Sequence, residues 1–183
     1  TSDFKEIEGL PDVIDGLVYC PGTINLKPFH RFSIEDFKND FEINLLGAVK
    51  VLQACLKGLK KSDTASVVLY STVAVGVGLG FHSSIASAKG AVEGLTRSLA
   101  AEWAPNKIRV NCVAPSLTDT PLANQLLGND DKKEASNKRH PLGRYGQPQD
   151  IAAATVYLLS DDASWMTGQI LHLDGGMSSV KGI

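Results

Sequence analysis

Short apolar runs alternate with longer amphipathic stretches along this chain of 183 residues. Four short runs are rich in apolar residues: 14–19, 65–70, 108–113 and 170–173. Runs of this length, bounded by glycine, proline or polar residues, are typical of strands that are buried on both faces of a parallel sheet. The pattern therefore predicts four parallel strands.

The stretches between these runs have helical periodicity. Ser33, with Asp36 three positions later, marks a helix start, and an apolar stripe at helical spacing continues to residues 60–61. Small and apolar residues over 85–104 predict a second helix, and Pro148 begins a third that runs to residue 159. Alternating strands and helices predict an α/β fold, a doubly wound parallel sheet that forms one domain over residues 1–183.

Two stretches break this alternation. Residues 76–80 are too rich in glycine to continue a strand and predict a flexible loop, whereas the polar residues 121–144 predict one or two short helices of a lid. Ligands of such sheets bind beyond the carboxyl ends of the strands. The side chains of interest should therefore lie at 19–22, 71–73 and 113–120.

Composition and charge narrow the function. Apolar residues make up 43% and charged residues 21% of the chain, which excludes disorder, and a net charge of -2 gives no support for nucleic-acid binding. The cysteines are odd in number, at Cys20, Cys55 and Cys112, and lie inside apolar runs, which indicates reduced core thiols of a cytoplasmic protein. We expect no metal, no membrane span and no secretion signal.

Five segments with consistent order and spacing carry the candidate chemistry. They are Gly22, Asn44, Lys89, the stretch 115–120 and the closing stretch 167–176. Together they resemble the short-chain dehydrogenase/reductase family, including its 3-oxoacyl-[acyl-carrier-protein] reductases. The resemblance implies a Rossmann-type fold, NAD or NADP as cofactor and a small carbonyl or enoyl substrate. It also implies a homodimer or homotetramer formed through the helices at 33–61 and 85–104 and through the last helix and strand.

The chain departs from the family's pattern at several places. Residues 1–10 lead directly into what corresponds to the family's fourth strand, so the N-terminal strands and the glycine-rich dinucleotide loop have no counterpart. We expect the natural protein to be longer by about 70 residues, at roughly 30 residues per strand-helix unit. Residues 19–22 replace the N-N-A-G motif, and Ile85 stands where the family has its catalytic tyrosine.

The catalytic candidates are Asn44, Ser71, Thr72, His82 and Lys89. By resemblance, Asn44 would hold a water that relays protons toward Lys89; a structural hydrogen bond is the alternative. Thr72, thirteen residues before Ile85, is favoured over Ser71 to polarise a substrate carbonyl, although either hydroxyl could simply make a turn.

His82 could replace the missing tyrosine, because seven positions on a helix bring it nearly onto the face of Lys89 and its imidazole titrates near neutrality. An exposed loop histidine is the competing interpretation. Lys89 would bind the nicotinamide ribose, or else be a solvated helix lysine.

The candidate cofactor-binding residues are Gly22, Asn44, Lys89, Pro115 and Thr120, with Ser116 placed where the family usually has glycine. Arg139, His140 and Arg144 could attract an anionic substrate, but solvated side chains are the preferred interpretation.

The leading functional hypothesis is an NAD(P)-dependent oxidoreductase that reduces a carbonyl or enoyl substrate, with the proton supplied by His82 or water. The alternative is a catalytically impaired relative that serves as a nucleotide-binding or oligomeric scaffold subunit. A third interpretation is that the chain as given binds no dinucleotide.

Overall fold

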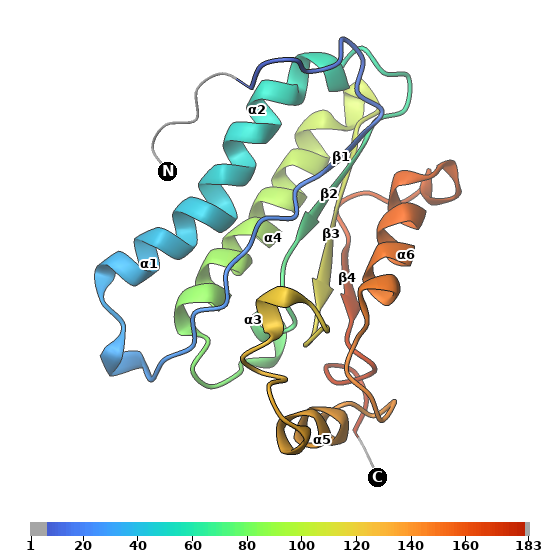
Figure 1. The fold of residues 1–183 in the computed structure, drawn as a ribbon. Helices are drawn as coiled ribbons and strands as arrows, with labels where there is room; N and C mark the ends of the chain where they lie inside the picture. The colour runs from blue at the N-terminus through green and yellow to red at the C-terminus, as the bar shows by residue number, and fades with distance from the viewer. Residues whose placement is uncertain (1–6, 182–183) are drawn as a thin grey trace.

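A computed structural model describes residues 7–181. Four parallel strands, β1 (Gly16–Val18), β2 (Ser66–Tyr70), β3 (Arg109–Pro115) and β4 (Ile170–Leu173), form one sheet in the order β1-β2-β3-β4 (Figure 1). Each strand therefore lies beside the strand that precedes it along the chain. The predicted strands are confirmed, although β1 is shorter than its apolar run.

Helices cover both faces of this sheet, as the alternation predicted. α1 (Ile34–Phe41), a π-helical turn (Glu42–Leu46) and α2 (Gly47–Leu59) form one continuous rod beside α4 (Ser83–Trp103), and α6 (Pro148–Leu159) lies on the opposite face (Figure 1).

Side chains of each strand alternate between two cores. Val67, Leu69 and Cys112 pack toward α2 and α4, whereas Val68 and Val113 pack toward α6. The predicted burial of the strands on both faces is thus confirmed.

One local expectation is revised. Residues 74–77 form a short helix, α3 (Ala74–Val77), which runs into the stretch 76–80 that we expected to be a flexible loop, and Gly78 ends it with a φ of 73°. Glycine adopts that left-handed conformation easily, so the glycine-rich sequence ends a helix here and does not form only a flexible loop.

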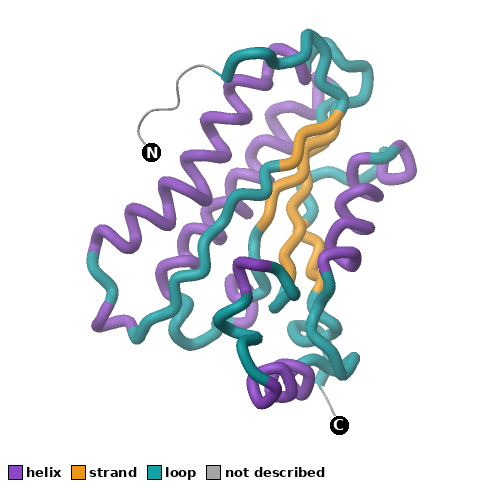
Figure 2. Tube along the Cα trace, in the orientation of Figure 1, coloured by secondary structure: helices purple, strands orange, loops and turns teal. Residues whose placement is uncertain are grey.

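The polar segment contains a 3-10 turn (Pro121–Ala123) and α5 (Asp130–Arg139), in agreement with the prediction of short helices. Figure 2 shows that α5 and the loops that follow the strands gather beyond the carboxyl ends of the sheet. Further 3-10 turns lie at Phe29–Arg31, Ala104–Asn106 and Asp161–Ala163. Over residues 7–181, no helix has the length and apolarity needed to cross a bilayer.

Candidate active site

A cavity of about 810 Å³ lies beyond the carboxyl ends of the strands. Its walls come from the loops after β1, β2 and β3, from the start of α4 and from α5. Seven of the eight predicted site residues line it: Gly22, Ser71, Thr72, His82, Lys89, Pro115 and Thr120. Asn44 lies just behind the wall, because a Cβ atom on Gly22 would come within 3.5 Å of its Oδ1.

Lys89 is a buried cation of this wall. Its side chain comes from α4, the residue is 7% exposed, and Nζ donates a hydrogen bond to the carbonyl oxygen of Tyr70 at 2.9 Å. Desolvation by burial lowers the pKa of Lys89 to about 8. The solvated alternative is therefore wrong.

Gly22 brings the backbone close to this lysine. A Cβ atom at that position would lie 3.6 Å from Lys89 Nζ and 3.5 Å from Asn44 Oδ1. A side chain would extend over both groups, so glycine leaves the cavity open to them.

Asn44 is buried in the π-helical turn of the rod. Its Nδ2 donates to the carbonyl oxygen of Asp40 at 2.8 Å and to Thr23 Oγ1 at 2.9 Å. Its Oδ1 is buried without a hydrogen-bond partner within residues 7–181. The expected buried environment is confirmed. The π turn, a feature common at functional sites, was not predicted.

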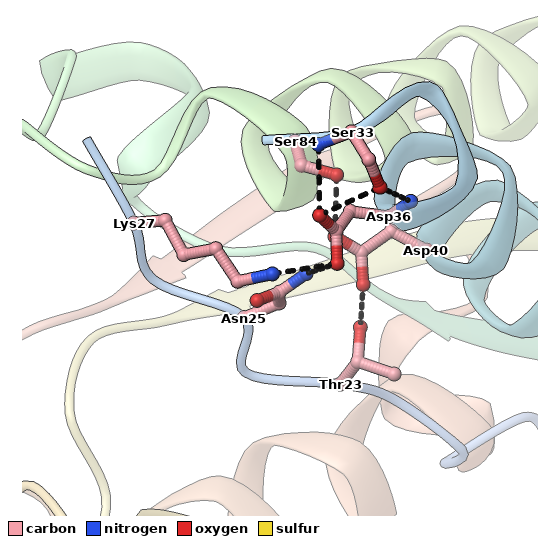
Figure 3. A network of polar contacts seen from close by, with 7 residues as sticks. All are labelled: Thr23, Asn25, Lys27, Ser33, Asp36, Asp40 and Ser84. Carbon is pink, nitrogen blue, oxygen red and sulfur yellow. Dashed lines mark hydrogen bonds and ion pairs between the residues drawn. The ribbon is translucent and has the colours of Figure 1, made fainter. Parts of the chain in front are cut away.

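A polar cluster holds the loop after β1 in place (Figure 3). The carboxylate of Asp40, 2% exposed, accepts hydrogen bonds from Thr23 Oγ1 at 2.7 Å and from Ser84 Oγ at 2.5 Å. It thereby joins the loop to α1 and α4. Sequence reasoning missed Asp40, since a single aspartate in a helix resembles any exposed one.

A second set of contacts anchors the same loop to the start of α1 (Figure 3). Lys27 Nζ lies 2.7 Å from Asp36 Oδ1, and Ser33 and Asp36 form the predicted capping box. The hydrogen bond from Lys27 lowers the pKa of the Asp36 carboxyl well below its usual value.

The two hydroxyls that end β2 have different environments. Ser71, 4% exposed, donates to Glu93 Oε1 at 2.8 Å, so its hydrogen is directed into α4. Thr72 is half-buried, and its Oγ1 accepts the N–H of Ala74 at 3.3 Å. Of the two hydroxyls, that of Ser71 directs its proton to Glu93 and that of Thr72 does not.

Ile85 and His82 lie on the same wall. Ile85 is buried at 5% exposure and offers no ionisable group. His82 caps the start of α4 and is half-buried, with Nδ1 at 2.6 Å from the carbonyl oxygen of Gly80. Since a carbonyl only accepts, Nδ1 carries the proton and Nε2 is an acceptor in the neutral ring.

The lid brings a second histidine into the wall. His140 is 3% exposed, and its Nε2 lies 2.9 Å from Ser116 Oγ. The preference for a solvated His140 is wrong, because the chain turns at the end of α5 and directs the ring inward. Arg139 is exposed at the cavity, and Arg144 forms a bidentate ion pair with Asp150, so Arg144 is not simply solvated.

Pro115 ends β3, and its carbonyl oxygen accepts the N–H of Val73 at 3.1 Å. Thr120 precedes the 3-10 turn in an extended conformation. Both lie where a ligand at the carboxyl edge of the sheet would meet them.

The family follows from comparison with known proteins. A family model described as enoyl-(acyl carrier protein) reductase matches residues 3–178. The chain belongs to the short-chain dehydrogenase/reductase family.

Relatives of this short-chain dehydrogenase/reductase carry several names. A tropinone reductase homolog of Arabidopsis thaliana is 36% identical over 162 residues, which are 88% of this chain and 62% of the relative. The 3-oxoacyl-[acyl-carrier-protein] reductase of Aquifex aeolicus is 34% identical, with 95% of this chain and 69% of the relative covered. The chain therefore spans less than two thirds of the length of the Arabidopsis relative.

Solved structures of the family have the same fold. A gluconate 5-dehydrogenase from Burkholderia cenocepacia, solved with NADP and tartrate, superposes with a TM-score of 0.87 at 29% identity and covers 92% of this chain and 66% of that one. The Rossmann-type parallel sheet expected from the resemblance is confirmed.

Proposed function

We propose that this chain carries the site at which an NAD(P)-dependent reductase acts on a small carbonyl or enoyl compound. The observation that carries the proposal is the buried Lys89 ammonium on the cavity wall, with Gly22 held open beside it. Burying a cation is unfavourable unless a ligand or fixed dipoles offset the loss of hydration. The single Tyr70 carbonyl offsets part of that loss, and ribose hydroxyls would complete it.

The residues of the wall fit a nicotinamide nucleotide. Lys89 would bind the ribose hydroxyls, Thr120 would bind the carboxamide, and the backbone at Gly22 and Pro115 would border the ring. Asn44 Oδ1 supports this fit, because a buried acceptor without a protein partner needs a donor from water or ligand. The nucleotide would supply a hydride when bound.

The residues of the chain would prepare the substrate oxygen for reduction. Thr72 would donate a hydrogen bond to it, because the Ser71 hydroxyl is directed to Glu93. Ile85 cannot transfer a proton, so another group must do so. His82 is the candidate that the sequence suggested, and its Nε2 lies beside the cavity.

The test is a fluorescence titration of the natural full-length protein with NADH and NADPH, followed by turnover on ketones and enoyl thioesters. Lys89→Met should weaken binding of the preferred nucleotide at least tenfold. Lys138→Met is the matched control, since Lys138 is exposed and paired with Glu134. Absence of saturable binding of both nucleotides would overturn the proposal.

Ile85 motivated a second candidate function, a scaffold subunit that binds the nucleotide without turnover, but the family comparisons do not favour it. In that case nucleotide binding would persist, no carbonyl or enoyl compound would be reduced, and Ile85→Tyr would create activity that the natural protein lacks. Turnover by the natural protein would rule this candidate out.

The assembly is proposed to be a homodimer or homotetramer, and exposed apolar side chains support an interface near α6. Val156 is 65% exposed, Tyr157 42% and Trp165 99%. A monomeric mass in solution would contradict the proposed assembly.

Cys55 and Cys112 are buried as expected, whereas Cys20 is exposed and the prediction of a core thiol there is wrong. All three cysteines are unpaired, which supports our proposal of a reducing, cytoplasmic location.

A further inference from the structure

Ser116 and His140 form a hydrogen-bonded couple on the cavity wall. Ser116 follows β3, and His140 ends α5, which lies beyond the carboxyl ends of the strands (Figure 1). The distance from Ser116 Oγ to His140 Nε2 is 2.9 Å, and both residues line the cavity. The couple therefore lies within reach of the proposed substrate.

The second ring nitrogen fixes the tautomer of His140. Nδ1 lies 2.7 Å from the carbonyl oxygen of Ser136, which can only accept a hydrogen bond. In the neutral ring the proton is therefore on Nδ1, Nε2 is bare, and the Ser116 hydroxyl donates to it. Both lone pairs of Ser116 Oγ are then available as acceptors.

One added proton reverses the direction of this bond. When Nε2 is protonated it donates to Ser116 Oγ, and the hydroxyl hydrogen is released toward another acceptor. The couple thus has two states that differ by one proton, and in the protonated state Ser116 can donate to an oxygen in the cavity.

Packing fixes the positions of the Ser116 and His140 side chains relative to each other. The N–H of Ser116 donates to the carbonyl oxygen of Leu173 at 3.1 Å. Gly175, with a φ of 59°, lets the backbone approach the ring closely, since a Cβ atom there would lie 3.5 Å from His140 Cβ. A relay requires this kind of fixed geometry.

Ser116 also lies near Thr72, whose hydroxyl is proposed to bind the substrate. β2 and β3 are adjacent, and the N–H of Val73 donates to the carbonyl oxygen of Pro115. Thr72 therefore follows the end of β2, and Ser116 follows the end of the neighbouring strand β3. Both residues line the cavity. One substrate oxygen could contact both hydroxyls.

We propose that Ser116, recharged by His140, supplies the proton that Ile85 cannot, and that the substrate is a ketone or aldehyde. This inference rests on the proposed reductase function. A bound reduced nicotinamide would supply the hydride to the carbonyl carbon. The carbonyl oxygen would take the Ser116 hydrogen, and Ser116 Oγ would take the proton on His140 Nε2. The products are an alcohol, oxidised nicotinamide and neutral His140, which regains a proton from solvent.

The couple is a better relay than His82. Protein packing buries His140 to 3% exposure and supplies it with a hydroxyl partner on the cavity, whereas His82 is half-buried and its ring contacts the Gly80 carbonyl two residues away. His140 is thus already coupled to a proton carrier.

The experiment compares Ser116→Ala, His140→Ala and the double variant of the natural full-length protein, with His30→Ala as control. His30 is exposed and lies outside the cavity lining. Each cavity variant should lower kcat for a ketone by about 10²- to 10⁴-fold, with nucleotide Kd changed less than about threefold. The double variant should be no worse than the poorer single variant, because the two residues act as a unit.

Two further readouts separate a relay from a structural role. Added imidazole should restore part of the kcat of His140→Ala and none of that of Ser116→Ala. Nitrogen-15 NMR without nucleotide should show the Nδ1–H tautomer of neutral His140, and Ser116→Ala should shift its Nε2 signal.

The outcomes distinguish the two proposals. Normal kcat in Ser116→Ala and His140→Ala, with nucleotide bound, would overturn the relay and leave the reductase function standing. An Nε2–H tautomer of neutral His140 would also overturn the relay. Failure of the natural protein to bind NADH and NADPH, or to reduce any carbonyl, would remove the function and the relay together.

Discussion

The Nζ atom of Lys89 lies 2.9 Å from the carbonyl oxygen of Tyr70, where burial lowers the pKa of Lys89 from its ordinary 10.5 to about 8. Between these values the unfolded chain binds more protons at Lys89 than the folded chain does. The free energy of unfolding contributed by Lys89 should therefore rise with pH over this window, by about 3 kcal/mol at most.

Urea unfolding of the protein and of Lys89→Met between pH 7.5 and pH 10.5 measures this pH dependence. The difference between the free energies of unfolding of the two proteins gives the contribution of Lys89. Burial also raises the pKa of Cys112 to about 12, which makes stability fall above the ordinary thiol pKa of 9, but that contribution is present in both proteins. Parallel stability curves for the two proteins would contradict the prediction.

Ser71 and Thr72 should respond oppositely to the same truncation. Ser71→Ala removes a buried donor to Glu93 Oε1 and should lower the free energy of unfolding by about 1–3 kcal/mol, with a smaller effect on kcat. Thr72→Ala should change stability by less than about 1 kcal/mol, because its contact to the Ala74 N–H is half-exposed and long.

Thr72→Ala should instead lower kcat for the substrate about 10²-fold, the size expected for loss of one donor to a developing oxyanion. Chemical unfolding and steady-state kinetics of the two variants check the pair. A loss of kcat in Ser71→Ala larger than that in Thr72→Ala would reverse the assignment.

The sequence was most informative where structure is decided locally. The Ser33 and Asp36 capping box, the proline start of α6 and the apolar strands depend on neighbours within a few positions, so pattern alone located them. The order of Gly22, Asn44 and Lys89 likewise indicated residues that the fold brings together, with Gly22 and Lys89 on the cavity wall and Asn44 just behind it.

The sequence was least informative where the decisive partner is distant. His140 follows two exposed basic residues of a polar helix, so it resembles a solvated side chain, and only the approach of Ser116, 24 positions earlier, makes it part of the cavity. Asp40 similarly depends on Ser84, 44 positions later. Such contacts arise from tertiary packing and leave no periodic signal.

Asp40 should be a major determinant of stability. Asp40→Ala removes the acceptor for the hydroxyls of Thr23 and Ser84 and should lower the free energy of unfolding by about 2–4 kcal/mol. Release of the Thr23 loop should also weaken nucleotide binding. The control is Glu35→Ala, whose exposed pair with Lys38 should contribute less than about 0.5 kcal/mol. Equal unfolding midpoints for the two variants would argue against the cluster.

Gly47 and Gly94 offer a matched test of packing around the rod. A Cβ atom on Gly47 would collide with the Tyr19 hydroxyl, which donates to the carbonyl oxygen of Ile43 at 2.6 Å in the π-helical turn. Gly47→Ala should therefore destabilise the fold by about 1–3 kcal/mol and disturb Asn44, next to Ile43.

Gly94 lies in α4, and a Cβ atom there would have no neighbour within 4 Å. Gly94→Ala should consequently stabilise the protein by about 0.5–1 kcal/mol, since alanine restricts the unfolded chain more than glycine does. Thermal and urea unfolding of both variants would test the pair. If Gly47→Ala were as stable as Gly94→Ala, Tyr19 would have room to move, and the π-helical turn at Asn44 would not depend on its hydroxyl.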